Sequence, residues 1–352
     1  MSKALFSRHY YDALMEEFKC NPLEFEPISF SIGSLTQQEL QRKWLCHQNG
    51  NAFARACNSG KKVIATTGFG MSGVPHMGTL AQILRALNLQ QAGIPVQIVL
   101  GDLDAYNGRN MEIEKTHELA VKFRQFIINL GFKDTYPSCL RTQYESLNTL
   151  RTAFLLGRFM DDEAFSKTEE DLHAFYAKHG KVDPSMTYRR KLSTNLMVAD
   201  FLELLLEKGF DAVLVAFGLD EHRYAMFGRD VFNRVIAGDP QRYAGKHYAA
   251  IYSGVMAGFN GYPQMSKSFP DSGITVDMSY NKICELIDNG EVVTSSPDTN
   301  IIYQMISFVS QYDGEQIKEA YDECAKQSDR WRSLKREYTT HLAHLCEQWN
   351  NT

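Results

Sequence analysis

Two short apolar runs with an amphipathic helix between them most constrain how this chain can fold. Residues 63–69 (VIATTGF) and 96–102 (VQIVLGD) each have the length and composition of a buried strand. Between them, a glycine-rich turn is followed by apolar residues at helical spacing from Leu80 onward. A strand, a helix and a strand within about forty residues form a βαβ unit, with parallel strands and a right-handed crossover. The continuous apolar run at 210–218 fits a further strand buried on both faces. The sequence therefore predicts an α/β protein with a Rossmann-type, doubly wound parallel sheet.

Helical patterns surround and interrupt this predicted sheet. Residues 1–60 are predicted to be a helical N-terminal extension, in which TQQE (36–39) forms a capping box at the start of a helix. Residues 137–190 are polar and charged without strand alternation, which predicts a helical insertion into the domain of residues 61–275. Residues 276–352 are predicted to form an α-helical C-terminal domain.

Charge and cysteine content narrow the class of protein. The net charge of −5 over 352 residues is not that of a basic nucleic-acid-binding chain. The seven cysteines contain no CxxC pair and no zinc-site spacing, and the ten histidines contain no HExxH, so no protein metal site is expected. With no signal peptide or membrane-spanning run, the sequence predicts a cytoplasmic protein with no membrane partner.

A glycine-rich turn at 68–78 (GFGMSGVPHMG) comes at the carboxyl end of the first predicted strand, where doubly wound sheets bind ligands. It matches neither GxGxxG nor GxxxxGK[ST], so it is neither a dinucleotide fingerprint nor a P-loop. The turn places His76 just before a helix, whose N-terminus attracts anions. A histidine there can donate a hydrogen bond to phosphate, although most histidines in such turns are structural.

Two further segments carry candidate functional residues. In GLDEHRY (218–224), Gly218 allows a ligand to approach the backbone and Asp220 can accept from ribose hydroxyls, or else Asp220 caps the next helix. In GYPQMSKSFPDSG (261–273), Lys267 stands between two serines on a loop without an apolar face. Taken alone, that lysine is simply solvated.

Together, PHMGT (75–79), GLDEHRY (218–224) and QMSKS (264–268) occur in an order that resembles class I aminoacyl-tRNA synthetases of the tyrosyl and tryptophanyl subgroup. PHMGT is similar to that family's HIGH motif, with Thr79 in place of the second histidine. QMSKS is similar to KMSKS, with Gln264 in place of the first lysine. The resemblance extends over about residues 62–276, is weaker beyond, and does not account for the N-terminal extension.

The resemblance implies that the 61–275 domain joins an amino acid to ATP, in a reaction in which the substrate carboxylate attacks the α-phosphorus and pyrophosphate leaves. Such catalysis positions the substrates and neutralises phosphate charge. His76 and Lys267 are implied to be the catalytic residues. The implied ATP-binding residues are Gly68, Gly78, Thr79, Gly218, Asp220, Met265, Ser266 and Ser268. Mg²⁺ would accompany ATP, held chiefly by phosphate oxygens.

The implied amino-acid pocket departs from the subgroup. Its residues are Thr66, Val99, Asp102, Asp104, Ser193, Met197, Asp200 and Glu221. The tyrosine pattern Y-x-x-x-Q-x-x-D is represented here by Ser193, Met197 and Asp200, so only the aspartate remains. Glu221 replaces a glutamine of the family motif. The pocket is therefore acidic and matches neither tyrosine nor tryptophan enzymes well.

The acceptor of the activated group stays open at this stage. The resemblance implies tRNA, and a homodimer formed through the inserted helices. The alternative is a ligase of the same fold that passes the aminoacyl group to a small amine, and a third possibility is an inactive paralogue, which the presence of both His76 and Lys267 disfavours. Residues 276–352 hold 7 Lys/Arg and 13 Asp/Glu, a net charge of 7 − 13 = −6. The basic segments 188–191 and 330–336 are either tRNA contacts or solvated helix faces.

Overall fold

The computed structural model describes residues 8–22, 31–168, 172–291 and 296–352. Its seven strands form one sheet in the order β1-β2-β7-β6-β3-β4-β5. The strands are β1 (Asn21–Pro22), β2 (Cys46–Gln48), β3 (Val63–Gly70), β4 (Val96–Gly101), β5 (Cys139–Thr142), β6 (Ala212–Gly218) and β7 (His247–Ser253).

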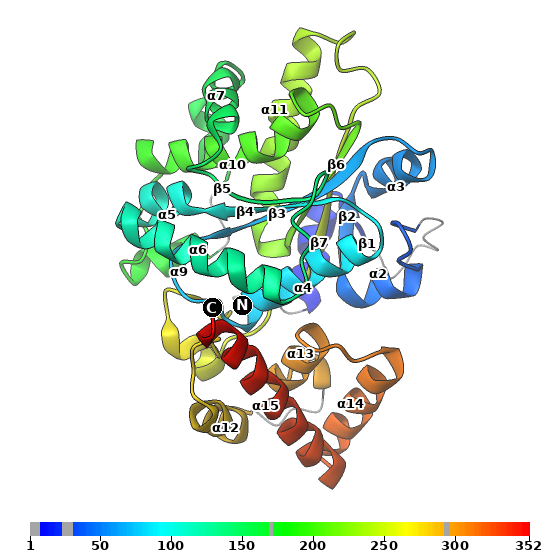
Figure 1. Cartoon of the computed structure of the whole chain (residues 1–352), viewed down its shortest axis with the longest axis vertical. Coiled ribbons are helices and arrows are strands. Elements are labelled where there is room, and N and C mark those ends of the chain that lie inside the picture. Colours follow the sequence, from blue (N-terminus) through cyan, green and yellow to red (C-terminus); the bar gives the residue numbers. More distant parts are fainter. Residues whose placement is uncertain (1–7, 23–30, 169–171, 292–295) are drawn as a thin grey trace. The chain divides into compact units, whose positions relative to one another are not determined.

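The five strands from β7 to β5 are parallel, and chain order reverses between the neighbours β3 and β6. The predicted doubly wound parallel sheet is thus confirmed. All residues of β4 and β6 are buried, as their continuous apolar runs require. Helices α10 (Tyr188–Leu206) and α11 (His222–Gly238) cover one face of the sheet, and α6 (Ile113–Asn129) covers the other (Figure 1).

The prediction of an all-helical segment 1–60 is wrong in part. Helices α1 (Arg8–Glu17), α2 (Gln37–Lys43) and α3 (Gly50–Asn58) are present, and Thr36 makes the predicted capping box with Glu39. However, β1 and β2 add two antiparallel strands beyond β7. At two and three residues, these strands are too short to show a periodic pattern in the sequence.

The predicted helical stretch 137–190 also contains a strand. Its first residues form β5, which pairs in parallel with β4 at the margin of the sheet. Only alternate residues of β5 are buried, and Arg141 interrupts the run of apolar residues that would predict a buried strand. The helices that follow are α7 (Leu147–Leu156), α8 (Asp162–Ser166) and α9 (His173–Lys178). A short helix that was not predicted, α5 (Asp102–Arg109), follows β4.

The chain divides into two compact units. The second unit, residues 14–72 and 85–254, contains the whole sheet. The first unit comprises residues 1–13, 73–84 and 255–352, and so combines the predicted helical C-terminal domain with two earlier segments. Its helices include α12 (Tyr280–Asn289), α13 (Ile301–Phe308), α14 (Gly314–Lys326) and α15 (Asp329–Asn350), and the beginning of α4 (Met77–Gln91).

The helices of the first unit enclose their own core. Trp331, Tyr338 and Trp349 of α15 are buried, and the Tyr338 hydroxyl donates to the carbonyl of Met305 at 3.0 Å. In the part of the chain that the structure describes, no helix has both the length and the apolar character needed to cross a bilayer.

Candidate active site

His76 is held at the start of α4 by hydrogen bonds within its own turn. The Thr79 amide donates to His76 Nδ1 at 3.3 Å, so the ring proton belongs on Nε2, which lies 3.5 Å from the Thr79 hydroxyl. Burial, and then the positive charge of Lys267, lower the pKa of His76 to about 3. A Cβ at Gly78 would lie 3.0 Å from the His76 ring, so this glycine lets the ring fold back over the turn. His76 is therefore a neutral hydrogen-bond donor at physiological pH.

The loop that carries Lys267 is a tight turn ordered by its own serines. The Ser266 amide donates to the Ser272 hydroxyl at 2.8 Å, and the Ser268 amide donates to the Ser266 hydroxyl at 3.2 Å. Met265 is buried, and a Cβ at Gly273 would come within 2.9 Å of its side chain. The serines thus shape the loop backbone, and Met265 anchors it.

Backbone contacts tie this loop to the His76 turn. The Met77 amide donates to the Ile274 carbonyl at 3.0 Å, and the Val276 amide donates to the Pro75 carbonyl at 3.0 Å. A Cβ at Gly73 would lie 3.3 Å from the Cβ of Lys267, which shows how closely the lysine stem packs on that backbone. The first unit therefore brings together seven of the predicted site residues: His76, Gly78, Thr79, Met265, Ser266, Lys267 and Ser268.

The other predicted nucleotide contacts belong to the second unit. A Cβ at Gly68 would lie 3.1 Å from the Val99 carbonyl oxygen, so the absence of a side chain at this position eases the packing of β3 on β4. Gly218 ends β6, and Asp220 lies inside the 3₁₀ turn Leu219–Glu221. The residue at the N-cap position of α11 is Glu221, one place after Asp220.

Asp200, one of the four acidic residues assigned to the amino-acid pocket, is bound by neighbouring side chains of the protein itself. Asp200 accepts from Arg141 Nη2 at 2.7 Å and from Gln143 Nε2 at 2.8 Å. Gln97 Nε2 donates to the Thr66 hydroxyl at 3.1 Å and to the Asp200 carbonyl at 2.9 Å. Burial raises the pKa of Asp200, and Arg141 and Gln143 oppose that rise. The expected acidic character of the pocket is therefore offset by a buried arginine.

Asp102 is also fully buried and is bound to the backbone. Its Oδ1 accepts from the amides of Leu103, Gln143 and Tyr144 at 2.9, 3.1 and 3.2 Å. Asp102 therefore holds the chain that follows β5 against the start of α5. Asp104 is partly exposed, and Ser193 donates to its carbonyl oxygen at 3.4 Å. Val99 is buried, and Met197 and Glu221 are half-buried.

Gln97, Arg141 and Gln143 were not singled out from the sequence, although a signal was present. A glutamine within the apolar run VQIVLG must find a hydrogen-bond partner, because an unpaired buried amide is costly. The Gln97 amide has four hydrogen-bond partners. Its Nε2 donates to the Thr66 hydroxyl and the Asp200 carbonyl, and its Oε1 accepts from Arg141 and Cys139.

The basic segments considered as tRNA contacts are engaged within the chain. Arg189 pairs with Asp183 at 2.7 Å, and Arg190 donates to the Ser185 carbonyl at 3.0 Å. Lys335 pairs with Glu291 at 2.6 Å, and both are largely buried. Lys335 is therefore part of the packing of α15. Among the described residues there is no group of three or more His, Cys, Asp or Glu that could hold a metal ion.

Comparison with known proteins agrees with this arrangement. The family model described as tRNA synthetases class I (W and Y) matches residues 58–348. The tryptophan–tRNA ligase of Aeropyrum pernix is 23% identical over 330 residues, which cover 89% of this chain and 84% of the relative. The tyrosine–tRNA ligase of Methanopyrus kandleri is 26% identical over 211 residues, covering 58% of this chain and 57% of the relative.

Solved structures show the same fold. Tryptophanyl-tRNA synthetase from A. pernix superposes with a TM-score of 0.78 at 19% identity, covering 98% of this chain and 93% of that one. A tryptophanyl-tRNA synthetase homolog from Entamoeba histolytica gives 0.74 at 11% identity, covering 100% and 94%. With its sheet topology, its ordered motifs and a family match over residues 58–348, the chain belongs to the class I tRNA synthetases of the tryptophan and tyrosine group, and is an aminoacyl-adenylate-forming ligase.

Proposed function

We propose that this protein activates tryptophan with ATP and transfers it to tRNA. Tryptophan is chosen over tyrosine because the relatives that align over 89% of the chain are tryptophan–tRNA ligases, whereas the tyrosine ligases align over 58% and 73%. The observation that carries the proposal is the backbone connection between the His76 turn and the Lys267 loop within one compact unit.

The proposed roles follow from the chemistry of these side chains. Neutral His76 donates through Nε2 to a phosphate oxygen, and Lys267 contributes the positive charge that stabilises the transition state as pyrophosphate leaves. Gly78, Thr79, Met265, Ser266 and Ser268 keep these two groups in place. Asp220 accepts a hydrogen bond from a ribose hydroxyl. Gly68 and Gly218 have no side chains, which lets the nucleotide come close to the backbone of β3 and β6. Mg²⁺ would be held chiefly by the phosphate oxygens of ATP and would supply further charge neutralisation there.

The proposed pocket for the amino acid is formed by Thr66, Val99, Asp102, Asp104, Ser193, Met197, Asp200 and Glu221, but its charge differs from the one that the sequence alone predicts. Because Asp200 is already paired with Arg141 and Gln143, it does not present a free charge to the substrate side chain. A substrate with an uncharged aromatic side chain therefore suits this part of the pocket better than a substrate with a basic side chain.

A homodimer is proposed through α7 and the start of α10. Six large apolar side chains are exposed there: Leu147, Leu150, Phe154, Leu155, Tyr188 and Leu192, with Leu147 75% and Phe154 86% exposed. Exposed apolar clusters of this kind are typical of protein–protein contacts. Helices α7 and α10 pack against one another (Figure 1), so the exposed apolar side chains project from two helices that support each other.

Amino-acid-dependent ATP–pyrophosphate exchange tests the first half-reaction. Tryptophan is expected to support exchange above all other standard amino acids, and Lys267→Ala is expected to reduce it roughly a hundredfold while ATP binding changes little. Wild-type exchange in that variant would remove Lys267 from the mechanism.

Charging of total tRNA with labelled tryptophan tests the second half-reaction. The product is expected to be sensitive to ribonuclease, and its formation to fall steeply with salt because tRNA is a polyanion. A ribonuclease-resistant product would replace tRNA by a small amine as the acceptor, without changing the first half-reaction.

A further inference from the structure

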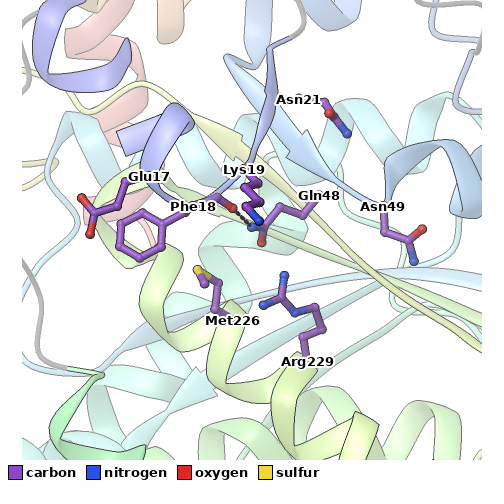
Figure 2. Close-up of a pocket in the computed structure, with 8 residues that line it drawn as sticks. All are labelled: Glu17, Phe18, Lys19, Asn21, Gln48, Asn49, Met226 and Arg229. Carbon is purple, nitrogen blue, oxygen red and sulfur yellow. Dashed lines mark hydrogen bonds between the residues drawn. The ribbon is translucent and has the colours of Figure 1, made fainter. Parts of the chain in front are cut away.

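A cavity of about 330 Å³ lies in the second unit, between the N-terminal segment and α11. Its lining residues are Glu17, Phe18, Lys19, Asn21, Gln48, Asn49, Met226 and Arg229 (Figure 2). Six of these eight precede residue 58, where the family match begins, and none is among the residues proposed above for ATP or the amino acid. The cavity is therefore a feature of this chain that the proposed function does not use.

Two cationic side chains point into this cavity. Figure 2 shows Lys19 and Arg229 extending toward its centre from opposite walls, while the Glu17 carboxylate points away from both. Among the described residues, the Lys19 ammonium has no ion-pair or hydrogen-bond partner. Arg229 donates through Nε and Nη2 to Asp230 at 3.3 and 3.2 Å, which leaves Nη1 for another acceptor. Because that pair is partly exposed, Asp230 neutralises Arg229 only weakly.

Uncharged groups complete the wall between the two cations. Gln48 is fixed, because its Nε2 donates to the Phe18 carbonyl at 2.9 Å and its Oε1 accepts from Tyr252 at 3.0 Å. The Asn49 amide is likewise fixed by donation to the Tyr248 carbonyl at 2.9 Å. The fixed amides add no negative charge, so the inner wall favours an anion.

Two residues that line the cavity have left-handed backbone conformations. Lys19 and Asn49, on two sides of the cavity, both have left-handed conformations, with φ of 53° and 57°. Lys19 occupies the position after α1 where glycine is usual, because the Cys20 amide closes the helix end on the Met15 carbonyl at 2.8 Å. A lysine is uncommon at this position, because its Cβ makes the left-handed conformation less favourable than it is for glycine.

The geometry points to a binding site for a phosphate group, held between Lys19 and Arg229. Arginine offers planar paired donors and lysine a compact charge, a combination suited to a tetrahedral oxyanion. Phe18 and Met226 form an apolar side to the cavity, which suits an organic group attached to the phosphate. The phosphate comes either from a small nucleotide or from an RNA backbone. This inference does not depend on the proposed aminoacylation.

The conformation of Lys19 at the end of α1 allows its charge to be removed without a loss of stability. Glycine is the residue best suited to that left-handed position, so Lys19→Gly removes the charge without harming the fold. The variant is expected to keep or raise the unfolding temperature without ligand, and to bind inorganic phosphate at this site roughly tenfold more weakly. Arg229→Gln is expected to weaken phosphate similarly. Lys318→Ala, which removes an exposed lysine of α14, is the charge-matched control and is expected to leave phosphate binding unchanged.

Crystals soaked in tungstate, a heavy phosphate analogue, show the site directly. An anomalous peak between Lys19 and Arg229 is expected in the wild type and none in Lys19→Gly. Displacement of tungstate by AMP but not by an oligouridylate identifies a small nucleotide as the source, and displacement by the oligouridylate identifies an RNA backbone. Equal phosphate affinity in the wild type and both pocket variants, with no peak between the two side chains, overturns the proposal.

Discussion

The stem of Lys267 packs directly over Gly73, since a methyl group placed on Gly73 would lie 3.3 Å from the Lys267 Cβ. That spacing is tighter than ordinary carbon–carbon contact and leaves no room for a branched side chain. The glycine-rich turn thus positions the lysine of a loop that is nearly two hundred residues away in the sequence.

Gly73→Val is therefore expected to displace Lys267 and lower the rate of pyrophosphate exchange by roughly tenfold, because a misplaced transition-state contact loses most of its value. Gly157→Ala is the matched control, since a Cβ at Gly157 meets nothing within 4 Å. An unchanged rate in Gly73→Val would mean that the lysine stem does not need this surface.

The low pKa of His76 predicts a pH dependence of stability. The folded value is about 3 because of burial and Lys267, whereas an unfolded histidine titrates near 6.5. Between these values the unfolded chain binds more protons, so stability is lost as pH falls from about 6.5 toward 3 and is unaffected above 7. Urea unfolding at pH 7 and pH 5 is expected to show a larger loss for the wild type than for His76→Gln. All other titratable groups are the same in the wild type and in His76→Gln. Equal losses of unfolding free energy in the two proteins would therefore show that His76 is readily protonated in the folded protein.

The buried pair Arg141–Asp200 is suited to a double-mutant cycle. The two side chains are 12% and 3% exposed. Arg141→Met leaves a buried carboxylate without its cation and is expected to cost ~3–5 kcal/mol of unfolding free energy. The double variant Arg141→Met with Asp200→Leu is expected to regain most of that loss. Breaking the exposed pair Lys282–Glu285 is the comparison, with an expected cost below about 1 kcal/mol. Additive losses at Arg141 and Asp200 would contradict their coupling.

Phe154→Asp tests the proposed dimer. A charge at Phe154, the most exposed apolar side chain of the cluster, is expected to convert a dimer of about twice the 40.1 kDa chain mass into a monomer, measured by light scattering after size-exclusion chromatography. Val121→Asp alters an exposed apolar residue on α6, outside the cluster, and is expected to leave the mass unchanged. A monomeric wild type would rule out this interface.

The parallel sheet could be predicted because its central strands are long apolar runs. Such runs can be recognised as buried strands without knowing which other strands they pair with. β5 and β2 could not be, since a strand of three or four residues exists only through pairing with β4 or β7. At the candidate site, His76 and Lys267 could be proposed from local motifs. Their connection through Pro75, Met77, Ile274 and Val276 depends on pairing between distant segments, which no local pattern encodes.

The partners of Asp200 could not be predicted for a related reason. A list of acidic residues predicts a negative pocket, but whether a carboxylate presents charge depends on which cation the fold places beside it. Arg141 lies 59 residues earlier, on a strand that the sequence did not reveal.

The short strands β1 and β2 also determine how the sheet ends. Without them, β7 would expose unpaired amides and carbonyls at Ala250, Ile251 and Tyr252, where it now pairs with β2. An open margin of that kind recruits strands from other molecules and starts aggregation. In this protein the outermost strand has only two residues, and one of them, Pro22, has no amide proton to donate. We therefore expect the N-terminal segment to limit self-association along the sheet, and a chain shortened by its first 60 residues to aggregate during refolding, measured by light scattering.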